Sequence, residues 1–408
     1  MKWISGSIFV LSVMLATIFP VKQDTEVTFY KNIAPVLLAK CAPCHHDGTH
    51  APFALITYDQ ARRRAETIRW VVLNRSMPPY KATSDFGIMH PGETMTDDEA
   101  VLVQRWVQTG MKEGDPKDIP PQPVFENGWQ LGRPDLIVEP EAKIAVKAEG
   151  PIYWRTFVIS PGLGKKRGLI GFDIRPKSPR NVRQAVLALD IEGKGRREDS
   201  KSATPGFETT GSLEAVTDEY IGAWASSHRS WRTPAGVAKT ITSKDRLLIQ
   251  IQYAPDGNPS DGSFELALYF AKGAKYAELE HLELGTRELV IPVLKSPTHE
   301  RTLTLDYDVR VISVIPEARL AATQVNLTAV LPSGSKKTIL RAYPWVLAWV
   351  GAYTFENPPR LSKGTKLVAA IAYENDRHGE RQGKTPIKYG PALTDELFWV
   401  RLQVAPAK

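Results

Sequence analysis

The spacing of apolar residues divides the chain into two regions with different periods. Between residues 27 and 112 apolar positions recur every three or four residues, as at Phe29, Ile33 and Leu37, and this period predicts helices. From about residue 134 onward, apolar residues alternate with polar ones or form short β-branched and aromatic runs between turn residues, which predicts strands. The pattern predicts a multidomain protein of the α-then-β class.

Two capping boxes mark helix starts in the first region. Thr57-Tyr-Asp-Gln60 predicts the start of a helix that runs to about Asn74. Thr96-Asp-Asp-Glu99 predicts the start of a second helix, for which Gly110 is the stop signal. In such a box the threonine hydroxyl accepts a hydrogen bond from the amide three residues on, while the side chain at that position reaches back.

A proline-rich linker, residues 114–133, follows the helices, since four prolines between Pro116 and Pro123 suit neither a helix nor a central strand. The β region of about 270 residues is more than one sandwich usually needs, so we predict two, at residues 134–275 and 285–408. The charged stretch Lys272–Leu284 is the predicted seam between them, and residues 193–236 a long connection. The clearest predicted strands are Leu247–Tyr253, Phe264–Phe270, Thr302–Val314, Gln324–Leu331 and Lys366–Tyr373.

The N-terminus has the pattern of an export signal, because Lys2 precedes an apolar run that ends near Phe19. Met14 stands two residues before Ala16, so no small-x-small cleavage site is evident, and residues 1–22 are either a cleaved signal peptide or an uncleaved membrane anchor. We therefore expect a periplasmic or cell-envelope protein, tethered to the membrane if the segment is retained.

The distribution of charged residues adds no further class of function. Residues 23–128 hold 11 basic and 14 acidic residues, and residues 129–408 hold 39 and 31. The basic residues are scattered and interleaved with acidic ones, as on an ordinary solvated surface. We expect no nucleic-acid partner.

Both cysteines of the chain lie in Cys41-Ala-Pro-Cys44-His45, the C-x-x-C-H pattern of c-type haem attachment. Two thiols three positions apart can form thioethers to the two vinyl groups on one porphyrin edge, and the adjacent histidine can ligate the iron. A zinc site would need ligands spaced more widely than His46 and His50. A redox dithiol would need a preceding strand, and a disulfide across two residues would be strained. We favour haem over zinc or a dithiol.

The sixth iron ligand must come from elsewhere in the chain, and Met77 in N-R-S-M-P-P-Y is the best candidate. Pro78 and Pro79 predict a loop there rather than a packed helical face, and a thioether ligand raises the reduction potential. The alternatives are a five-coordinate iron or another ligand of the same domain, namely Met89, His90, Met95, His46 or His50.

The segments VTFYKNIAPVLLAKCAPCHHDGTHAPFALITYDQARRRAETIRWVVLNRSMPPY and MTDDEAVLVQRWVQTGMKEGDP closely resemble the cytochrome c domain at the N-terminus of many exported acidobacterial and planctomycete-type proteins. The similarity covers residues 27–135. It implies a small all-α cytochrome c domain, residues 23–113, with haem c attached to Cys41 and Cys44. It also implies that His45 and Met77 are the axial ligands.

In that family the cytochrome domain is often followed by a region that resembles the copper type II, ascorbate-dependent monooxygenases. NGWQLGRPDLIV, SWRTPAGVAKTITSKDRLLIQIQYAPDGNPSDGSFELALYFAKG, VISVIPEARLAA and NPPRLSKGTKLVAAIAYEND are similar to it. The resemblance implies two jelly-roll-like sandwiches flanking a cleft. Copper in that family is held by five histidines and a methionine, and the corresponding positions here are Arg183, Gln184, Gln252, Glu317, Arg319 and Leu397.

We expect no copper, because no methionine follows Met111 and the remaining histidines are scattered, at His228, His281, His299 and His378. Asp256–Gly262 superficially suggests a calcium loop, but position twelve is Ala267 rather than Glu, and we predict a hairpin turn. The Trp-rich segment Arg341–Phe355 either lines the cleft or packs as buried strands, and we favour packing.

Two functions follow. The favoured one is an exported electron carrier with one covalent haem, whose copperless double sandwich is a scaffold or docking module for a redox partner protein or an envelope component. Such a protein catalyses no substrate chemistry. The alternative is an enzyme, a haem-coupled copper-dependent monooxygenase that acts in the sandwich cleft.

Overall fold

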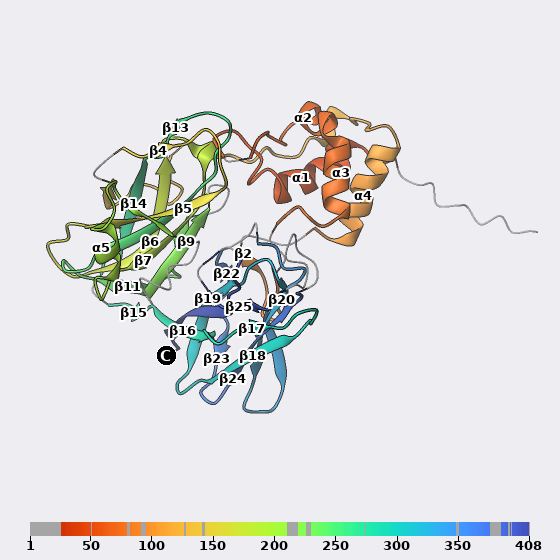
Figure 1. Ribbon diagram of the computed structural model, residues 1–408. Helices are drawn as coiled ribbons and strands as arrows, with labels where there is room; N and C mark the ends of the chain where they lie inside the picture. The colour runs from red at the N-terminus through yellow and green to blue at the C-terminus, as the bar shows by residue number, and fades with distance from the viewer. Residues whose placement is uncertain are drawn as a thin grey trace, which may run out of the picture.

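The computed structural model describes residues 26–49, 51–79, 82–90, 95–125, 128–140, 143–209, 219–225, 230–273, 275–347, 351–375, 385–390, 392 and 394–407. The predicted signal or anchor at residues 1–22 lies outside these ranges, as do His50, His228 and His378. The described chain is mostly β, with several antiparallel sheets and a few N-terminal helices (Figure 1). Among the described residues, no helix is long and apolar enough to span a membrane.

The helical region contains a π-helical turn and short α-helices: η1 Phe29–Ile33, α1 Ala34–Lys40, α2 Tyr58–Arg63, α3 Ala65–Leu73 and α4 Asp97–Gln108. Both capping boxes are confirmed, with Thr57 and Thr96 accepting from the amides of Gln60 and Glu99. Gly110, at φ +90°, follows the end of α4. The single helix predicted from Thr57 to Asn74 is wrong, because Arg64, at φ −116° and ψ 8°, separates α2 from α3.

The core of this region joins its first and last helices. Phe29, Ile33 and Leu37 are buried together with Val103 and Trp106 of α4. The rings of Phe29 and Trp106 lie 5.8 Å apart, and the indole N–H of Trp106 donates to the carbonyl of Lys112 at 3.0 Å. The chain after α4 is thereby fixed to the same core, and it continues through the short 3₁₀ helix η2, Pro116–Asp118.

Two sheets pack face to face to form the first sandwich. One sheet has the order β8 (Phe207–Thr209), β5 (Tyr153–Ile159), β12 (Leu247–Tyr253), β7 (Val182–Leu189) and β9 (Glu219–Ala225). The other has the order β15 (Ala277–Glu278), β11 (Val237–Ile241), β6 (Arg167–Pro176), β14 (Phe264–Phe270) and β3 (Leu136–Val138), with β10 (Trp231–Arg232) beside β6. Apolar side chains of both sheets, such as Ile249 and Phe172, share one core.

Two predictions for this sandwich are wrong. The presumed connection at residues 193–236 contains the helix α5 (Lys194–Asp199) and the strands β8, β9 and β10, and β9 pairs with β7 along its length. The presumed hairpin at Asp256–Gly262 joins β12 to β14, which belong to different sheets. Its short strand β13 (Ser260–Asp261) pairs instead with β4 (Ala145–Val146).

The second sandwich also has two sheets, with a core of its own. One has the order β1 (Ala82–Thr83), β21 (Lys336–Ala342), β20 (Ala322–Val330), β24 (Lys366–Tyr373) and β18 (Thr298–Thr304). The other has the order β16 (Glu280–Gly285), β26 (Trp399–Pro406), β19 (Val309–Glu317), β22 (Tyr353–Phe355) and β2 (Met89–His90). The short strand β23 (Arg360–Leu361) pairs with β19, and β17 (Val290–Ile291) and β25 (Ile387–Lys388) form a separate two-stranded sheet.

The single strand predicted at Thr302–Val314 is wrong, because residues 305–308 carry the chain from β18 in one sheet to β19 in the other. Two short strands of the second sandwich, β1 and β2, are not among the predicted strands. The strands β1 and β2 come from the helical region, between α3 and α4, and one joins each sheet of the second sandwich.

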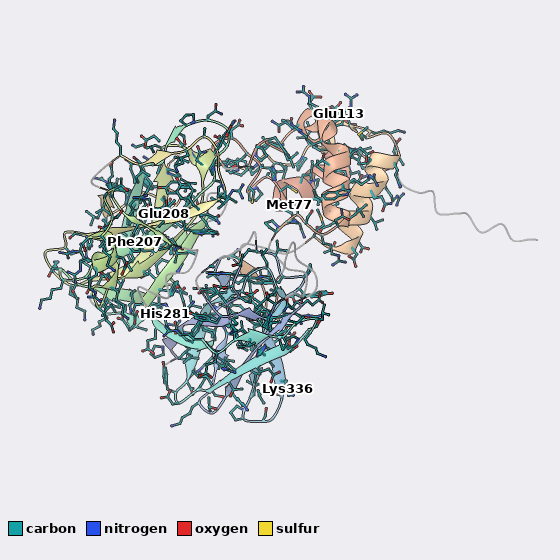
Figure 2. The ribbon with its side chains drawn as sticks, in the orientation of Figure 1. Met77, Glu113, Phe207, Glu208, His281 and Lys336 are labelled. Carbon is teal, nitrogen blue, oxygen red and sulfur yellow. The ribbon has the colours of Figure 1, made fainter. Side chains whose placement is uncertain are left out.

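A buried polar cluster joins the two sandwiches. Gln403 of β26 accepts from the indole N–H of Trp231 at 3.1 Å and from the hydroxyl of Ser313 at 2.7 Å, and it donates to the carbonyl of Ile221. His281 lies beside this amide, where the sandwiches meet (Figure 2). Burial, with smaller contributions from Lys239 and Arg401, lowers the pKa of His281 to about 3, so the ring is neutral at ordinary pH.

Candidate functional site

The Cys41–His45 motif continues the end of α1 as one further helical turn. The amides of Cys44 and His45 donate to the carbonyl of Cys41 at 3.0 and 2.8 Å, and the amide of Cys41 donates to Leu37 at 2.9 Å. Positions i, i+3 and i+4 of such a turn share a face. The predicted attachment residues Cys41 and Cys44 and the predicted ligand His45 are therefore brought together on one side of the turn, and neither cysteine forms a disulfide.

The imidazole of His45 is fixed from one side. Its Nδ1 lies 3.0 Å from the carbonyl oxygen of Phe53, which selects the tautomer with a proton on Nδ1 and leaves Nε2 with a lone pair. The ring of Phe53 lies 4.9 Å away, and burial lowers the pKa of His45 although the carbonyl of Phe53 opposes this shift. This is the tautomer and charge state that a metal-ligating histidine requires.

The segment after the motif folds back against it. Buried Thr49 donates from its hydroxyl to the carbonyls of Cys44 at 2.5 Å and His46 at 2.9 Å, and the amide of Leu55 donates to His45 at 2.8 Å. The guanidinium of Arg64 lies 4.7 Å from the centroid of Phe53. Phe53 lies eight residues from His45, and Thr49 lies five and three residues from Cys44 and His46. These separations belong to no sequence motif, so neither residue could be predicted from the sequence.

Cys41 is held in a less polar setting than an exposed thiol. Burial raises its pKa to about 12, the neighbouring Cys44 and Glu99 add to the shift, and Lys40 opposes it. Lys40 and Glu99 form an ion pair of 2.9 Å between α1 and α4, with most of both side chains covered. Burial acts to raise the pKa of Glu99, but hydrogen bonds from Lys40 and Thr96 outweigh it and the net shift is downward. This pair fixes the motif to the second capped helix.

His46 is held by the linker that follows the helical region. Its Nδ1 lies 2.8 Å from the carbonyl oxygen of Ala42, and its ring is stacked on Phe125 with the centroids 3.7 Å apart. The sequence predicts His46 only as an alternative iron ligand, and no motif marks its contact with Phe125. Because the ring is half-buried and paired on one face, His46 connects the motif to residues 114–133.

Met77 lies in the loop after α3, as expected, with 42 % of its surface exposed and its amide 3.3 Å from the carbonyl of Val71 (Figure 2). Met95 packs against the helical core, and its role as an alternative ligand stays a prediction. The expectation that Met89 and His90 are within reach of the same domain is wrong. Met89 is 5 % exposed in the core of the second sandwich, and His90 pairs with Thr354.

The residues that the resemblance places at copper-ligand positions lie near one another within each sandwich. Gln184 of β7 and Gln252 of β12 are direct cross-strand partners, next to Arg183. In the second sandwich Glu317 forms an ion pair of 2.5 Å with Arg401. The amide and guanidinium of Arg319 donate to Glu396 and to Ala392, beside Leu397.

Glu317 and Arg319 thus have partners within the protein, and Gln184 and Gln252 carry neutral amides. Among the residues that the structure describes, no group of three or more His, Cys, Asp or Glu has a metal-binding arrangement.

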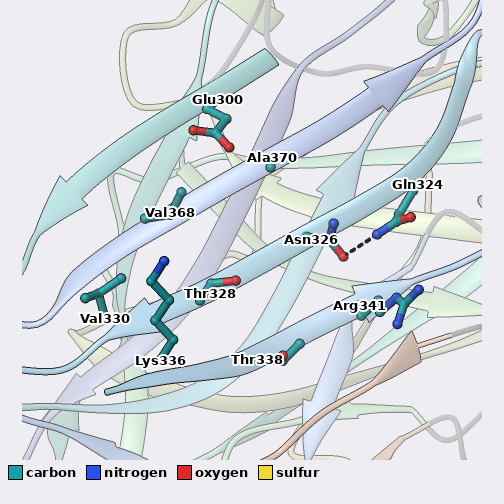
Figure 3. Close-up of a pocket in the computed structure, with 10 residues that line it drawn as sticks. All are labelled: Glu300, Gln324, Asn326, Thr328, Val330, Lys336, Thr338, Arg341, Val368 and Ala370. Carbon is teal, nitrogen blue, oxygen red and sulfur yellow. Dashed lines mark hydrogen bonds between the residues drawn. The ribbon is translucent and has the colours of Figure 1, made fainter. Parts of the chain in front are cut away.

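A second candidate site is a groove of about 430 Å³ on the outer face of the β1-β21-β20-β24-β18 sheet (Figure 3). Its floor consists of small and neutral polar side chains of β20 and β24, among them Thr328 and Ala370, and the amide of Gln324 donates to Asn326 at 2.9 Å. Lys336, Arg341 and Glu300 supply the charges. The groove has hydrogen-bonding groups for an extended polar ligand, and its described lining residues include no nucleophile paired with a base.

No protein-family model matches the chain, and no curated protein matches it. Solved structures with weak similarity include the viral capsid protein STIV MCP, with a TM-score of 0.23, 11 % identity, and coverage of 66 % of this chain and 95 % of that chain. VP2 of infectious bursal disease virus has a TM-score of 0.18, 7 % identity, and coverage of 69 % and 81 %. A candidate secreted protein from Eubacterium rectale has a TM-score of 0.18, 11 % identity, and coverage of 62 % and 69 %. Scores this low assign neither a family nor a function.

Proposed function

We propose that this protein is an exported c-type cytochrome that carries one covalent haem and transfers electrons in the periplasm or cell envelope. The observation that carries the proposal is the turn at residues 41–45. It places Cys41, Cys44 and His45 on one face, and the carbonyl of Phe53 keeps the His45 proton on Nδ1. The resemblance of residues 27–135 to exported cytochrome c domains points in the same direction.

The residues present fit a covalent haem. Cys41 and Cys44 would attach it, His45 Nε2 would be one axial ligand, and the thioether of Met77 would be the other. Trp70 and Leu73, on the helix that leads to Met77, are 62 % and 41 % exposed, which is apolar surface of the kind that an apolar macrocycle covers. When bound, the haem supplies a one-electron change of iron. The chain's own contribution is to hold the His45 tautomer and to place Met77.

In this proposal the two sandwiches, jelly-roll-like as in the copper monooxygenases, serve as a docking or scaffold module rather than as an oxygenase. The side chains at the copper-ligand positions support this choice. Glu317 pairs with Arg401, and the guanidinium of Arg319 donates to the carbonyl of Ala392. Gln184 and Gln252 offer amides, which are weak ligands for copper. No observation favours the monooxygenase alternative over the electron carrier.

Metal and haem analysis of the purified full-length protein tests the proposal. We expect about one iron per chain, all of it in haem that stays with the polypeptide under denaturing conditions, because thioether bonds survive unfolding. The comparison is the same preparation after treatment with a copper chelator, which should leave iron content and the haem spectrum unchanged. Copper at one or more per chain, or iron outside haem, would overturn the electron-carrier proposal.

Met77→Ala is expected to convert a six-coordinate haem into one with an open coordination position. The weak near-red band of iron–thioether ligation disappears, and carbon monoxide binds the reduced protein, while haem stays covalently attached. Met95→Ala is the matched control, because Met95 is the other methionine of the helical core, and it should retain both properties. An unchanged Met77→Ala spectrum would transfer the role to Met95.

A further inference from the structure

The chain between α3 and α4 makes an excursion from the helical region to the second sandwich. At its base Arg75 and Asp97 form an ion pair of 2.5 Å, so the segment leaves and re-enters the helices at one place. Met77 lies on the outgoing arm and Met95 on the returning arm. Residues 82–90, called the tip here, form β1 and β2 at the far end.

The tip is hydrogen-bonded to both sheets of the second sandwich. Thr83 and Ala82 pair with Arg341 and Ala342 of β21, and Met89 pairs with Phe355 of β22. Between the two strands, Asp85 makes two bonds with Thr338. Its amide donates to the carbonyl of Thr338 at 2.9 Å, and its carboxylate accepts from the amide of Thr338 at 2.7 Å.

Side-chain burial adds to these backbone bonds. Met89 is 5 % exposed within the sandwich core, and Phe86 packs against the same core with the ammonium of Lys337 5.4 Å from its ring centroid. A strand added to a sheet edge is held by backbone hydrogen bonds and by side chains that enter pockets. The tip is therefore an integral part of the second sandwich, although its neighbours in sequence are helical.

This attachment limits where Met77 can be. On one side, the amides of Ser76 and Met77 donate to the carbonyl of Val71 at 2.9 and 3.3 Å. On the other side, Ala82 is five residues further on, a reach of at most about 18 Å. We propose that the second sandwich positions Met77, and that β1, Asp85 and Met89 form a clamp whose release frees the sixth iron ligand.

The inference rests on the proposed function for the identity of the ligand, but the clamp itself concerns residues that the structure describes. In this arrangement a displacement of the second sandwich, for instance when a redox partner docks on it, is transmitted along the outgoing arm to Met77. Asp85 and Met89 are positioning residues, since neither is placed at the haem. The second sandwich thereby controls whether the iron has a thioether ligand.

The test uses the full-length protein with the double substitution Phe86→Ala/Met89→Ala. Hydrogen exchange of the amides in residues 82–90 reports whether the tip has left the sandwich. We expect the amides of Ser76 and Met77 to exchange about tenfold faster once it has. We also expect the near-red band to disappear and carbon monoxide to bind, with covalent haem content unchanged.

Leu367→Ala is the matched control, because Leu367 is equally buried in the same core but lies on β24. It should leave the band and the exchange of Ser76 and Met77 unchanged. If the double variant does not fold, Asp85→Ala is used in its place, because Asp85 is exposed and its substitution leaves the core intact. This variant removes the hydrogen bond from the amide of Thr338 to the carboxylate and should give the same changes to a smaller extent.

A released tip with unchanged exchange at Ser76 and Met77 would overturn the clamp. Wild-type protein without covalent haem would overturn the proposed function instead, and the exchange measurement would still decide the clamp.

Discussion

The double variant Cys41→Ser/Cys44→Ser is expected to contain no covalent haem. Serine preserves the size of each side chain and the turn that the backbone makes between Cys41 and His45, but a hydroxyl does not form the thioether. Mass spectrometry under denaturing conditions should find the bare polypeptide, against a chain with one haem in the wild type. Each single variant should retain the haem through one thioether, with reduced yield.

Pro43→Ser is the control for this experiment, because Pro43 lies in the same turn, is exposed, and has no thiol. It should carry haem at the wild-type level. Haem-stained gels give the same answer independently of mass. Covalent haem on the double variant would show that the attachment residues are not the two cysteines. A zinc or dithiol site would give a wild type without haem and a variant that loses bound zinc or thiol reactivity.

The parts of the fold that local chemistry determines could be predicted from the sequence. Both capping boxes are present as predicted, since the cap and its partner lie three residues apart and need nothing else from the chain. The strands Leu247–Tyr253, Phe264–Phe270 and Lys366–Tyr373 have the predicted bounds. In each case a mainly apolar segment of seven or eight residues lies between turn residues such as glycine, proline or aspartate.

What the sequence did not reveal depends on partners far along the chain. Residues 305–308 interrupt the strand predicted at Thr302–Val314. The interruption could not be predicted, because buried Leu305 continues the apolar alternation into the turn. The strands β1 and β2 have two residues each, too few for any period, and β1 is defined only by β21 some 258 residues later. For the same reason Met89 resembled a further haem ligand, although it is a core residue of another sandwich.

In the candidate site, too, the local features could be predicted from the sequence and the contacts between separate segments could not. The spacing of Cys41, Cys44 and His45 is local, and a single helical turn places them on one face. The contacts that orient the site are not local in this sense. Phe53 reaches His45 across an irregular loop, and Phe125 of the linker stacks on His46. Neither contact follows from a motif, because aromatic side chains in loops have no fixed offset from their partners.

Glu317 belongs to a buried ion-pair cluster of the second sandwich. Arg401 is 1 % exposed in its side chain, and it donates to Glu283 at 2.7 Å and pairs with Glu317 at 2.5 Å. Its guanidinium also lies 4.4 Å from the ring centroid of Tyr220 on β9, in the first sandwich. Burial disfavours the charge of Arg401, but Glu317, Tyr220 and Glu283 outweigh it and raise its pKa.

Arg401→Met is accordingly expected to lower the free energy of unfolding by about 3–5 kcal/mol, because it leaves the carboxylate of Glu317 buried without its cation. Urea unfolding followed by tryptophan fluorescence measures the loss. The double variant Arg401→Met/Glu317→Leu should recover part of it, since apolar replacement of both partners removes the uncompensated charge. Arg360→Ala is the control. It removes the exposed 3.1 Å pair with Asp308, and its cost should stay below about 1 kcal/mol. A cost as small as this for Arg401→Met would contradict the expectation that the substitution leaves Glu317 buried without a compensating charge.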